Sequence, residues 1–406
     1  MKKNIFLLLL VTTITYGYYG LLTSMYKKQH MKTFRERLSF FRKKHNKTIN
    51  DVVVKREPTN EDNYNLNWYV VGKSEDFKKG KLEQVNIWDK KYVVWRENTT
   101  HLHSMDNHCS HRGASLSLGK LTHSSENEER IVCPYHGYEF DNKGTLCKIP
   151  GIEFTNTNCH NQMTYPVVQQ DGWIYMNVVP TQFKQVEEHS IFREPEAADK
   201  SFSKILLDVT FNAPARLVSE NSLDLMHIGF VHTFGNRENP NPICEIPPFL
   251  CDYKNIFHYK TIYEYNSGEK SLAKKVFKFD NLTIENEFIL PHTTVARIIF
   301  GDKTSTVITI ALPQNNTHTK LFVKTYRNYW NKNDTSVLGD VNNYLGDLLT
   351  KYMMEKTVVQ DKDVVENIDP LYIDGKYNMK YDKLQNVYRS MYTKHVKNIT
   401  DNKISK

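Results

Sequence analysis

Short apolar runs alternate with polar turn segments in the first half of the chain. The clearest runs fall at residues 68–71, 84–88, 92–95 and 172–178, and each is rich in Val, Ile, Tyr or Trp. Runs of this length and composition favour strands, and the Gly, Asn and Asp residues between them favour turns. The pattern predicts a small antiparallel all-β domain over residues 63–182.

A longer apolar period replaces the short runs after about residue 204. Apolar positions in residues 215–232 recur on one helix face, and residues 337–366 predict a second, longer helix that Pro370 would end. Strand-like runs separated by turn residues lie between these two segments. Both periodicities therefore occur in the second half of the chain.

The second half is consequently predicted to differ in class from the first. A strand at 206–211, further strands over 256–329 and two helices indicate an α+β domain over residues 183–395. Residues 396–406 are mostly polar, and we expect a disordered tail there.

The N-terminus begins with an uncharged segment. Residues 4–22 contain no charged side chain, and residues 6–11 are apolar throughout. A segment of this length can span a bilayer as a helix. A cleaved signal peptide is the alternative, but no small-x-small cleavage site follows, and tyrosines near the end of the segment are typical of a membrane interface. We therefore predict an N-terminal transmembrane helix, an anchor at residues 1–25.

Positive charge is concentrated directly after this segment. The chain has a net charge of +8, and residues 27–47 contain nine Lys or Arg residues with Glu36 as the only acid. A basic run can indicate nucleic-acid binding, but its position favours a juxtamembrane linker, residues 26–62, attracted to anionic lipid. Only Lys2 and Lys3 precede the anchor, so the positive-inside rule predicts a single-pass membrane protein with its catalytic domains on the cytosolic side and no nucleic-acid partner.

Two cysteine–histidine pairs stand inside the predicted β domain. The first is Cys109-Ser-His111 and the second is Cys133-Pro-Tyr-His136. Two thiolates and two imidazoles from two tight loops are the ligand set of a Rieske [2Fe-2S] centre, whose neutral imidazoles raise the reduction potential above that of an all-cysteine cluster. Zinc sites usually have a different spacing, with paired cysteines and paired histidines. The pairs therefore indicate an electron-transfer site.

A second group of metal-binding side chains lies in the helix predicted at 215–232. Asp224 and His227 would share a helix face, and His232 could approach them if the helix ends or bends near Gly229. Two histidines with a carboxylate from elsewhere would form the facial triad of a non-haem Fe(II) site, which leaves positions open for O₂ and substrate. One buried core histidine and one surface histidine are the alternative for an isolated pair. The electron-transfer site upstream favours the iron site, which needs an electron supply.

The two sites in this order resemble the Rieske non-haem iron oxygenases. The match joins the two pairs to an N-x-x-D-x-x-H-x-x-x-x-H motif that begins at Asn221, and it covers about residues 64–370. The resemblance implies a helix-grip catalytic domain, one [2Fe-2S] cluster and one mononuclear Fe(II) per subunit. It implies Asp361 as the third iron ligand, with Asp363 as the alternative, in a run similar to the family's E-D-x-x-V-V-E. Gln360 stands where the family usually has Glu, which is a departure.

The resemblance also implies roles for two polar residues of the helix predicted at 215–232. Asp224 matches the carboxylate that hydrogen-bonds a cluster histidine of one subunit and an iron histidine of its neighbour, so a homotrimer is expected. A solvated position on the helix surface is the alternative for Asp224. Asn221 matches an asparagine close to the active site.

Two features narrow the resemblance within the family. Residues 133–140 and 144–150 are similar to the chlorophyllide a oxygenase and pheophorbide a oxygenase group, whereas an anchor before a Rieske domain is similar to the cholesterol 7-desaturases. The resemblance implies hydroxylation or desaturation, with O₂, of a hydrophobic sterol-like or chlorin-like substrate. A separate NAD(P)H-dependent reductase or ferredoxin would supply electrons, because the chain lacks a G-x-G-x-x-G dinucleotide fingerprint.

A membrane-anchored Rieske electron carrier without oxygenase activity is the alternative class. The carriers of cytochrome bc complexes have an additional cysteine in each cluster loop, where this chain has Ala114 and Tyr135. They also lack the downstream histidine motif. A family member that kept the cluster and lost oxygenation is disfavoured because all three candidate iron ligands are present.

Overall fold

The computed structural model describes most of the two predicted domains. The predicted anchor at 1–25, the linker at 26–62 and the last part of the predicted tail lie outside the described residues. Within the described residues, no helix is both long and apolar enough to cross a membrane. The described residues are 66–97, 101–153, 160–182, 191–251, 256–330, 337–375 and 379–397.

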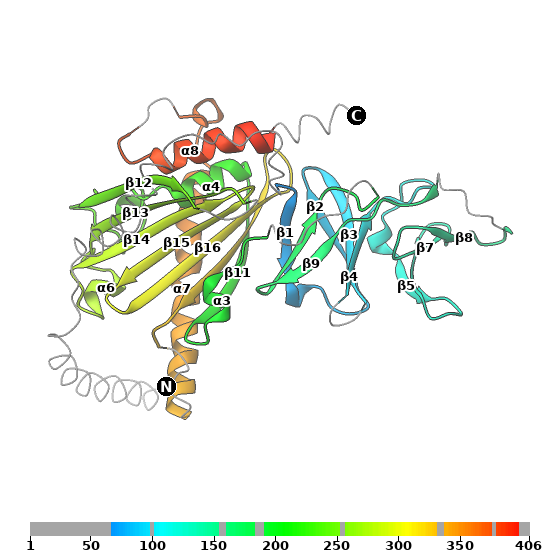
Figure 1. The fold of residues 1–406 in the computed structure, drawn as a ribbon, viewed down its shortest axis with the longest axis horizontal. Coiled ribbons are helices and arrows are strands. Elements are labelled where there is room, and N and C mark those ends of the chain that lie inside the picture. The colour runs from blue at the N-terminus through cyan, green and yellow to red at the C-terminus, as the bar shows by residue number, and fades with distance from the viewer. Residues whose placement is uncertain are drawn as a thin grey trace. The chain divides into compact units, whose positions relative to one another are not determined.

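Small antiparallel sheets make up the first part of the described chain (Figure 1). The first sheet contains β1 (Trp68–Lys73), β10 (Trp173–Asn177) and β9 (Val167–Gln170), and the second contains β2 (Leu82–Ile87), β3 (Lys90–Arg96) and β4 (Leu102–Asp106). The third contains β5 (Lys120–His123), β6 (Glu129–Val132), β7 (Glu139–Asp141) and β8 (Leu146–Lys148), and the short helices are η1 (Ser74–Asp76) and η2 (Leu116–Leu118). This part confirms the predicted all-β domain.

A larger antiparallel sheet forms the second part. The described strands follow the order β11-β17-β16-β15-β14-β13-β12. Their bounds are β11 (Ser203–Phe211), β12 (Cys244–Leu250), β13 (His258–Asn266), β14 (Asn281–Ile289), β15 (Thr293–Phe300), β16 (Lys303–Pro313) and β17 (Thr319–Arg327). The sequence pattern placed the second set of strands from residue 256 and missed β12, an edge strand that contains two prolines and is only partly buried.

Helices lie beside this sheet, as the prediction of an α+β domain requires (Figure 1). They are α3 (Pro195–Ala198), α4 (Ala215–Leu223), α5 (Ile228–Val231), α6 (Leu272–Lys275), α7 (Val337–Val365), η5 (Pro370–Tyr372), α8 (Lys383–Tyr392) and a final π-type turn, η6 (Thr393–Lys397). Asn286 of β14 donates its side-chain amide to the carbonyl of Leu223 at 3.0 Å, and Phe288, two positions on, contacts Tyr388 of α8. One sheet face is therefore covered by α4 and α8.

The opposite face of the large sheet packs against the small sheets, and together they form one core. Ile289, Val295 and Ile308 belong to the same buried cluster as Trp68 and Val70 of β1. The alternation of side chains along β14 explains the division, because neighbouring positions point to opposite faces. The two parts of the described chain are thus joined by a continuous apolar core.

The C-terminal packing extends further than the sequence pattern indicated. The pattern did not predict α8, which buries Leu384, Tyr388 and Tyr392. Val396 is 1% exposed and belongs to the same cluster. The expectation of a disordered tail from residue 396 is therefore wrong at its first residue, because an apolar side chain there completes the core.

The helix predicted at 215–232 is interrupted. Helix α4 ends at Leu223, and Asp224 adopts an extended conformation with φ −79° and ψ 118°. The Asp224 Oδ1 atom accepts the backbone N–H groups of Met226 at 2.7 Å and His227 at 3.3 Å, so the side chain replaces the helical hydrogen bonds of the next residues. The prediction that Asp224 and His227 share a helix face is therefore wrong.

Candidate metal centres

The two cysteine–histidine loops have the same backbone hydrogen bonds. The Cys109 N–H donates to the carbonyl of Ala114 at 2.9 Å, and the Gly113 N–H donates back to the carbonyl of Cys109 at 2.8 Å. In the second loop, Cys133 pairs in the same way with Tyr138 at 2.8 Å and with Gly137 at 3.1 Å. Both glycines have positive φ, +70° and +71°, which only glycine adopts without strain.

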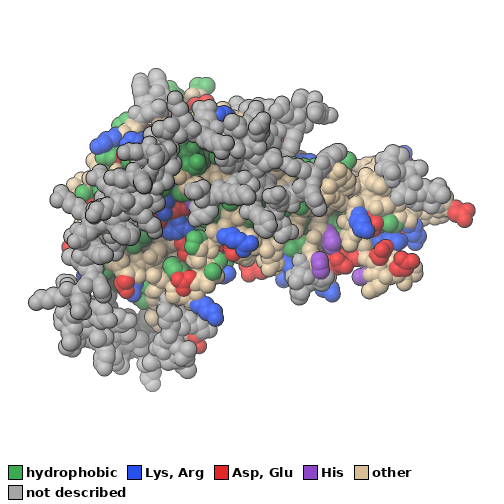
Figure 2. All heavy atoms as spheres, in the orientation of Figure 1, with side chains coloured by type: hydrophobic (Ala, Val, Ile, Leu, Met, Phe, Trp, Pro, Cys, Tyr) green, Lys and Arg blue, Asp and Glu red, His purple; other side chains and the backbone are tan. Residues whose placement is uncertain are grey.

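Each loop buries its cysteine and exposes its histidine. Cys109 and Cys133 are 3% and 2% exposed and belong to one apolar cluster, whereas His111 and His136 are exposed with ring centroids 4.6 Å apart. Tyr138 stacks on His111 at 4.8 Å. Figure 2 shows histidine side chains at the surface on the side of the molecule that the small sheets form. The four predicted cluster ligands are therefore brought together as an inner thiol pair and an outer imidazole pair.

The environment of the thiols fits a cluster of two irons. Burial, with a smaller contribution from the neighbouring Cys133, raises the pKa of the Cys109 thiol to about 11, although the backbone N–H groups of His111 and Arg112 oppose the shift. The two thiols form no disulfide. Cluster ligation requires thiolates, and the negative charge of two buried thiolates is compensated when they bind a cation. Separate sulfur and imidazole pairs match the Rieske arrangement of two Cys on one iron and two His on the other.

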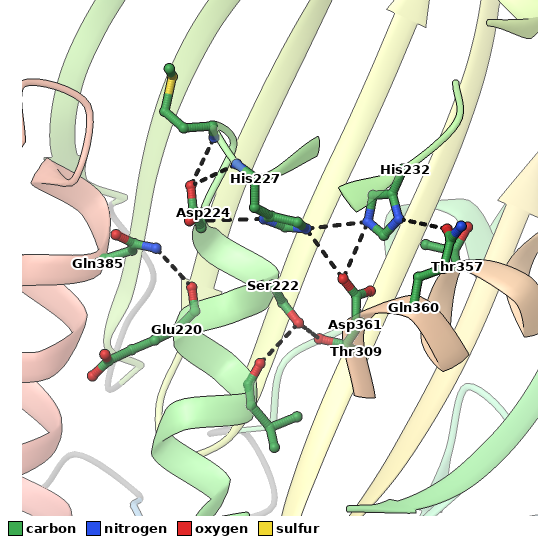
Figure 3. Close-up of polar contacts among 12 residues, drawn as sticks. Glu220, Ser222, Asp224, His227, His232, Thr309, Thr357, Gln360, Asp361 and Gln385 are labelled. Carbon is green, nitrogen blue, oxygen red and sulfur yellow. Dashed lines mark hydrogen bonds and ion pairs between the residues drawn. The ribbon is translucent and has the colours of Figure 1, made fainter. Parts of the chain in front are cut away.

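The second group of ligands converges from α7 and from the residues that flank α5 (Figure 3). The His227 Nε2 and His232 Nε2 atoms lie 3.3 and 3.2 Å from Asp361 Oδ1, and 3.2 Å from each other. Helix α7 presents Asp361 towards them, whereas Asp363 is exposed on the same helix. The structure therefore brings Asp361, and not Asp363, to the two histidines.

This triangle has the dimensions of a metal site. Bonds of about 2.1 Å from a first-row divalent ion to three mutually cis ligands place neighbouring ligand atoms about 3 Å apart. The side chains of His227, His232 and Asp361 are only 14%, 3% and 17% exposed. Asp361 Oδ1 is buried and accepts no hydrogen bond, although both imidazoles lie beside it. The residues thus fit a mononuclear ion held by two nitrogens and one carboxylate.

Electrostatics keep this group ready to bind a cation. Burial opposes ionisation of Asp361, but the adjacent imidazoles of His227 and His232 outweigh it and lower the pKa of the carboxyl to about 2. Burial likewise disfavours the charged form of His227, yet the neighbouring carboxylates of Asp361 and Asp224 raise the pKa of the imidazole overall. The carboxylate is therefore anionic at neutral pH, as a metal ligand must be.

The Nδ1 atoms of the two imidazoles, the outer nitrogens that face away from Asp361, have different surroundings. His232 Nδ1 lies 3.1 Å from Gln360 Oε1, and its ring stacks on Phe234 with centroids 5.1 Å apart. His227 Nδ1 is buried without a hydrogen bond and has Asp224 Oδ2 3.9 Å away. Gln360 and Phe234 were not predicted as site residues. The sequence marked Gln360 only as a departure next to Asp361, and nothing in the pattern pointed to Phe234.

Two further predicted residues lie beside the triangle. The side chain of Asp224 is 31% exposed and faces His227 without hydrogen-bonding its ring. Asn221 is half-buried in the last turn of α4, where its backbone carbonyl accepts the N–H of Asp224. Its side chain is not in the metal-binding group that the described residues form.

Comparison with known proteins supports the first of these two centres directly. Residues 67–159 match the family described as the Rieske [2Fe-2S] domain. The chain is 31% identical over 168 residues to chlorophyllide a oxygenase of Chlamydomonas reinhardtii, which covers 41% of this chain and 24% of that protein. It is 22% identical over 179 residues to the oxygenase component of 3-ketosteroid-9-alpha-monooxygenase of Rhodococcus rhodochrous, which covers 43% of this chain and 45% of that protein. The chain thus spans between about a quarter and a half of these curated relatives.

Solved structures show the same fold over most of the described chain. Dicamba monooxygenase superposes with a TM-score of 0.67 at 18% identity, covering 84% of this chain and 99% of that one. The QL mutant of NdmA of Pseudomonas putida CBB5, bound to caffeine, superposes with a TM-score of 0.64 at 20% identity, covering 81% of this chain and 90% of that one. Residues 67–159 are therefore a Rieske [2Fe-2S] domain by their match, and the described chain shares the fold of these two solved structures. A Rieske domain implies a [2Fe-2S] cluster, and Rieske non-haem iron oxygenases carry a mononuclear iron as well.

Proposed function

We propose that this protein is a Rieske-type oxygenase that hydroxylates or desaturates a hydrophobic, ring-containing substrate. Cys109, His111, Cys133 and His136 would hold the [2Fe-2S] cluster, and the facial triad would hold Fe(II); the triad is His227, His232 and Asp361. When bound, the cluster supplies single electrons and the mononuclear ion supplies a binding position for O₂.

The convergence of the facial triad carries this proposal. Asp361 is contributed by a helix more than a hundred residues after the histidines, yet its Oδ1 atom lies within 3.3 Å of both imidazole nitrogens. A pure electron carrier has no use for a second buried group of this kind, so the alternative of a Rieske carrier without oxygenase activity is not favoured.

The side chains around the triad set its charge and its shape. Asp361 supplies one negative charge in a site that is largely closed to water. The turn at Asp224 directs the chain from α4 into α5, so that His227 and His232 stand at the two ends of one short helix. These residues preorganise three ligands as a facial set, which would leave the remaining positions of a bound ion open for O₂ and substrate.

A pair of carboxamide variants of α7 tests the proposal. The full-length protein would be purified in detergent and supplied with a reductase, NAD(P)H, ¹⁸O₂ and a panel of sterols and chlorins. We expect the wild type and Asp363→Asn to convert one class, and Asp361→Asn and His227→Ala to lose conversion by at least about 100-fold while the Rieske EPR signal persists. Mass spectrometry reports label in hydroxylated product or the loss of two hydrogens in desaturated product. Conversion that survived in both Asp361→Asn and His227→Ala would exclude the triad as the site of oxygenation.

The substrate class is proposed from the relatives together with the anchor. The names of chlorophyllide a oxygenase and 3-ketosteroid-9-alpha-monooxygenase specify a chlorin and a steroid, both large and apolar ring systems. A membrane anchor at residues 1–25, with the catalytic domains on the cytosolic side, would hold the enzyme where such substrates accumulate. Resistance of the full-length protein to extraction by alkaline carbonate would support the anchor, and release into the soluble fraction would contradict it.

The partners are proposed on the same basis. A relative named as an oxygenase component supports a separate NAD(P)H-dependent reductase or ferredoxin as the electron donor. A homotrimer would bring the exposed His111 and His136 of one subunit to Asp224 of the next, whose partly exposed carboxylate supports such a contact. Sedimentation equilibrium of the detergent-solubilised protein tests the trimer, and a monomer would contradict it.

A further inference from the structure

The outer nitrogen of His232 has a defined hydrogen-bond partner. Its Nδ1 atom lies 3.1 Å from the side-chain oxygen of Gln360, in a part of the site where His232 is only 3% exposed (Figure 3). Gln360 directly precedes Asp361 on α7, so one helix supplies both the carboxylate that faces the inner nitrogen and the amide that faces the outer one. The ring of Phe234 covers one face of the imidazole at 13° to its plane.

No comparable contact positions the other histidine. His227 Nδ1 is buried without a hydrogen bond, and its nearest acidic neighbour, Asp224 Oδ2, is 3.9 Å away. This separation is too long for a hydrogen bond. Among the described residues, Gln360 is therefore the one side chain that makes a direct hydrogen bond to the outer nitrogen of a triad imidazole.

The hydrogen bond has a consequence for the tautomer of His232. A neutral imidazole carries one N–H and one lone pair, and a metal ligand must present the lone pair to the ion. A cation between His232 Nε2 and Asp361 therefore requires the hydrogen to reside on Nδ1. Gln360 Oε1 is the acceptor placed to receive it.

We propose that Gln360 is a positioning residue of the mononuclear metal site. Its amide oxygen holds His232 in the Nδ1–H tautomer and directs the Nε2 lone pair at the ion. The inference rests on the proposed metal site. Because glutamine is neutral, Gln360 does this without adding a second negative charge beside Asp361, so the three ligands retain the single charge of the carboxylate.

Binding of Co²⁺ tests this role independently of turnover. The full-length protein would retain its cluster, have the mononuclear site stripped with a chelator, and be titrated with Co²⁺ alone while the d–d absorption bands are recorded. Gln360→Met keeps the length of the side chain and removes the acceptor. We expect it to weaken Co²⁺ binding about 10- to 100-fold, the usual effect of removing such a contact, and to shift the d–d bands because His232 is no longer held.

Two further variants separate positioning from general damage. Gln360→Glu keeps an acceptor at the same place and should restore Co²⁺ affinity to the wild-type level or above it. Gln385→Met is the matched control, since Gln385 of α8 donates to the backbone carbonyl of Glu220 at 3.0 Å and lies outside the triad. It should bind Co²⁺ like the wild type, and circular dichroism would establish that each variant is folded.

The outcomes distinguish this inference from the proposed function. If folded Gln360→Met binds Co²⁺ as tightly as the wild type, or if Gln360→Glu fails to restore binding, the positioning role is wrong. If instead the wild type binds Co²⁺ no better than His227→Ala, the metal site itself is wrong, and the inference falls with it.

Discussion

At the scale of single residues, Asp224 divides its two carboxylate oxygens between two tasks. Oδ1 accepts the N–H groups of Met226 and His227 and so forms the turn that ends α4. Oδ2 faces His227 Nδ1 from 3.9 Å and remains partly exposed. An asparagine oxygen can form the same turn but carries no charge, so the two tasks can be separated by substitution.

We expect Asp224→Asn to keep the fold and both metals but to slow reoxidation of the reduced protein by O₂ and substrate about 10- to 100-fold. Asp224→Ala should in addition lower the free energy of unfolding by about 1 kcal/mol, because two backbone N–H groups lose their acceptor. Single-turnover measurements of the Rieske absorption give the rate, and iron analysis gives the metal content. An unchanged rate in Asp224→Asn would show that the charge has no part in coupling the two sites.

At the scale of elements, a buried ion pair joins the small sheets to the large one. The Glu194 carboxylate, 1% exposed, precedes α3 and accepts Trp173 Nε1 of β10 at 2.7 Å, Lys324 Nζ of β17 at 2.7 Å and the Tyr326 hydroxyl at 2.6 Å. Burial lowers the pKa of Lys324 although Glu194 lies beside it. The pair is thus a specific connection between strands that are distant in the sequence.

Lys324→Met should destabilise the protein by about 3–5 kcal/mol, because it leaves the Glu194 carboxylate buried without its cation. Glu194→Gln combined with Lys324→Met should cost clearly less than the sum of the two single changes, since neither charge then remains unpaired. Urea unfolding followed by tryptophan fluorescence measures all three variants. Additive losses would mean that the two side chains do not act as a pair.

Elements with a strong local period were predictable, and those defined by contacts were not. The long helix α7 and most strands follow the apolar pattern, whereas α8 and the end of α4 do not. The extent of α8 depends on burial of Leu384 and Tyr388 against the sheet, and the end of α4 depends on the side-chain conformation of Asp224. Neither is visible in periodicity, because periodicity reports which residues face a core and not where a side chain replaces a backbone hydrogen bond.

At the scale of the whole molecule, His292 ties the two folded parts together. The Val70 N–H of β1 donates to His292 Nε2 at 2.9 Å, and the imidazole is fully buried next to Tyr69. Burial lowers the pKa of His292 to about 3. The folded protein therefore requires a neutral imidazole at this junction.

This burial predicts acid sensitivity with a definite sign. The folded pKa lies below the unfolded value of about 6.5, so stability from this group is complete above pH 6.5 and falls as the pH decreases towards 3. Between pH 7 and 5, the wild type should lose about 2 kcal/mol more than His292→Gln, which can accept the same N–H but does not titrate. Urea titrations at the two pH values measure the difference, and parallel losses in both proteins would contradict the assignment.

The sequence by itself determined the ligand types and the two structural classes. Cys109, His111, Cys133 and His136 occur in two short loops, so chain connectivity alone constrains their geometry. The family resemblance favoured Asp361 but left Asp363 open, and the tertiary structure decided between them by bringing Asp361 to the two histidines. Only the tertiary structure placed Gln360 on His232, a contact between residues 128 positions apart. The physical reason is the same in both cases: α7 packs with one face towards the site, and that rotation is set by the core beneath the helix, not by the residues that bind.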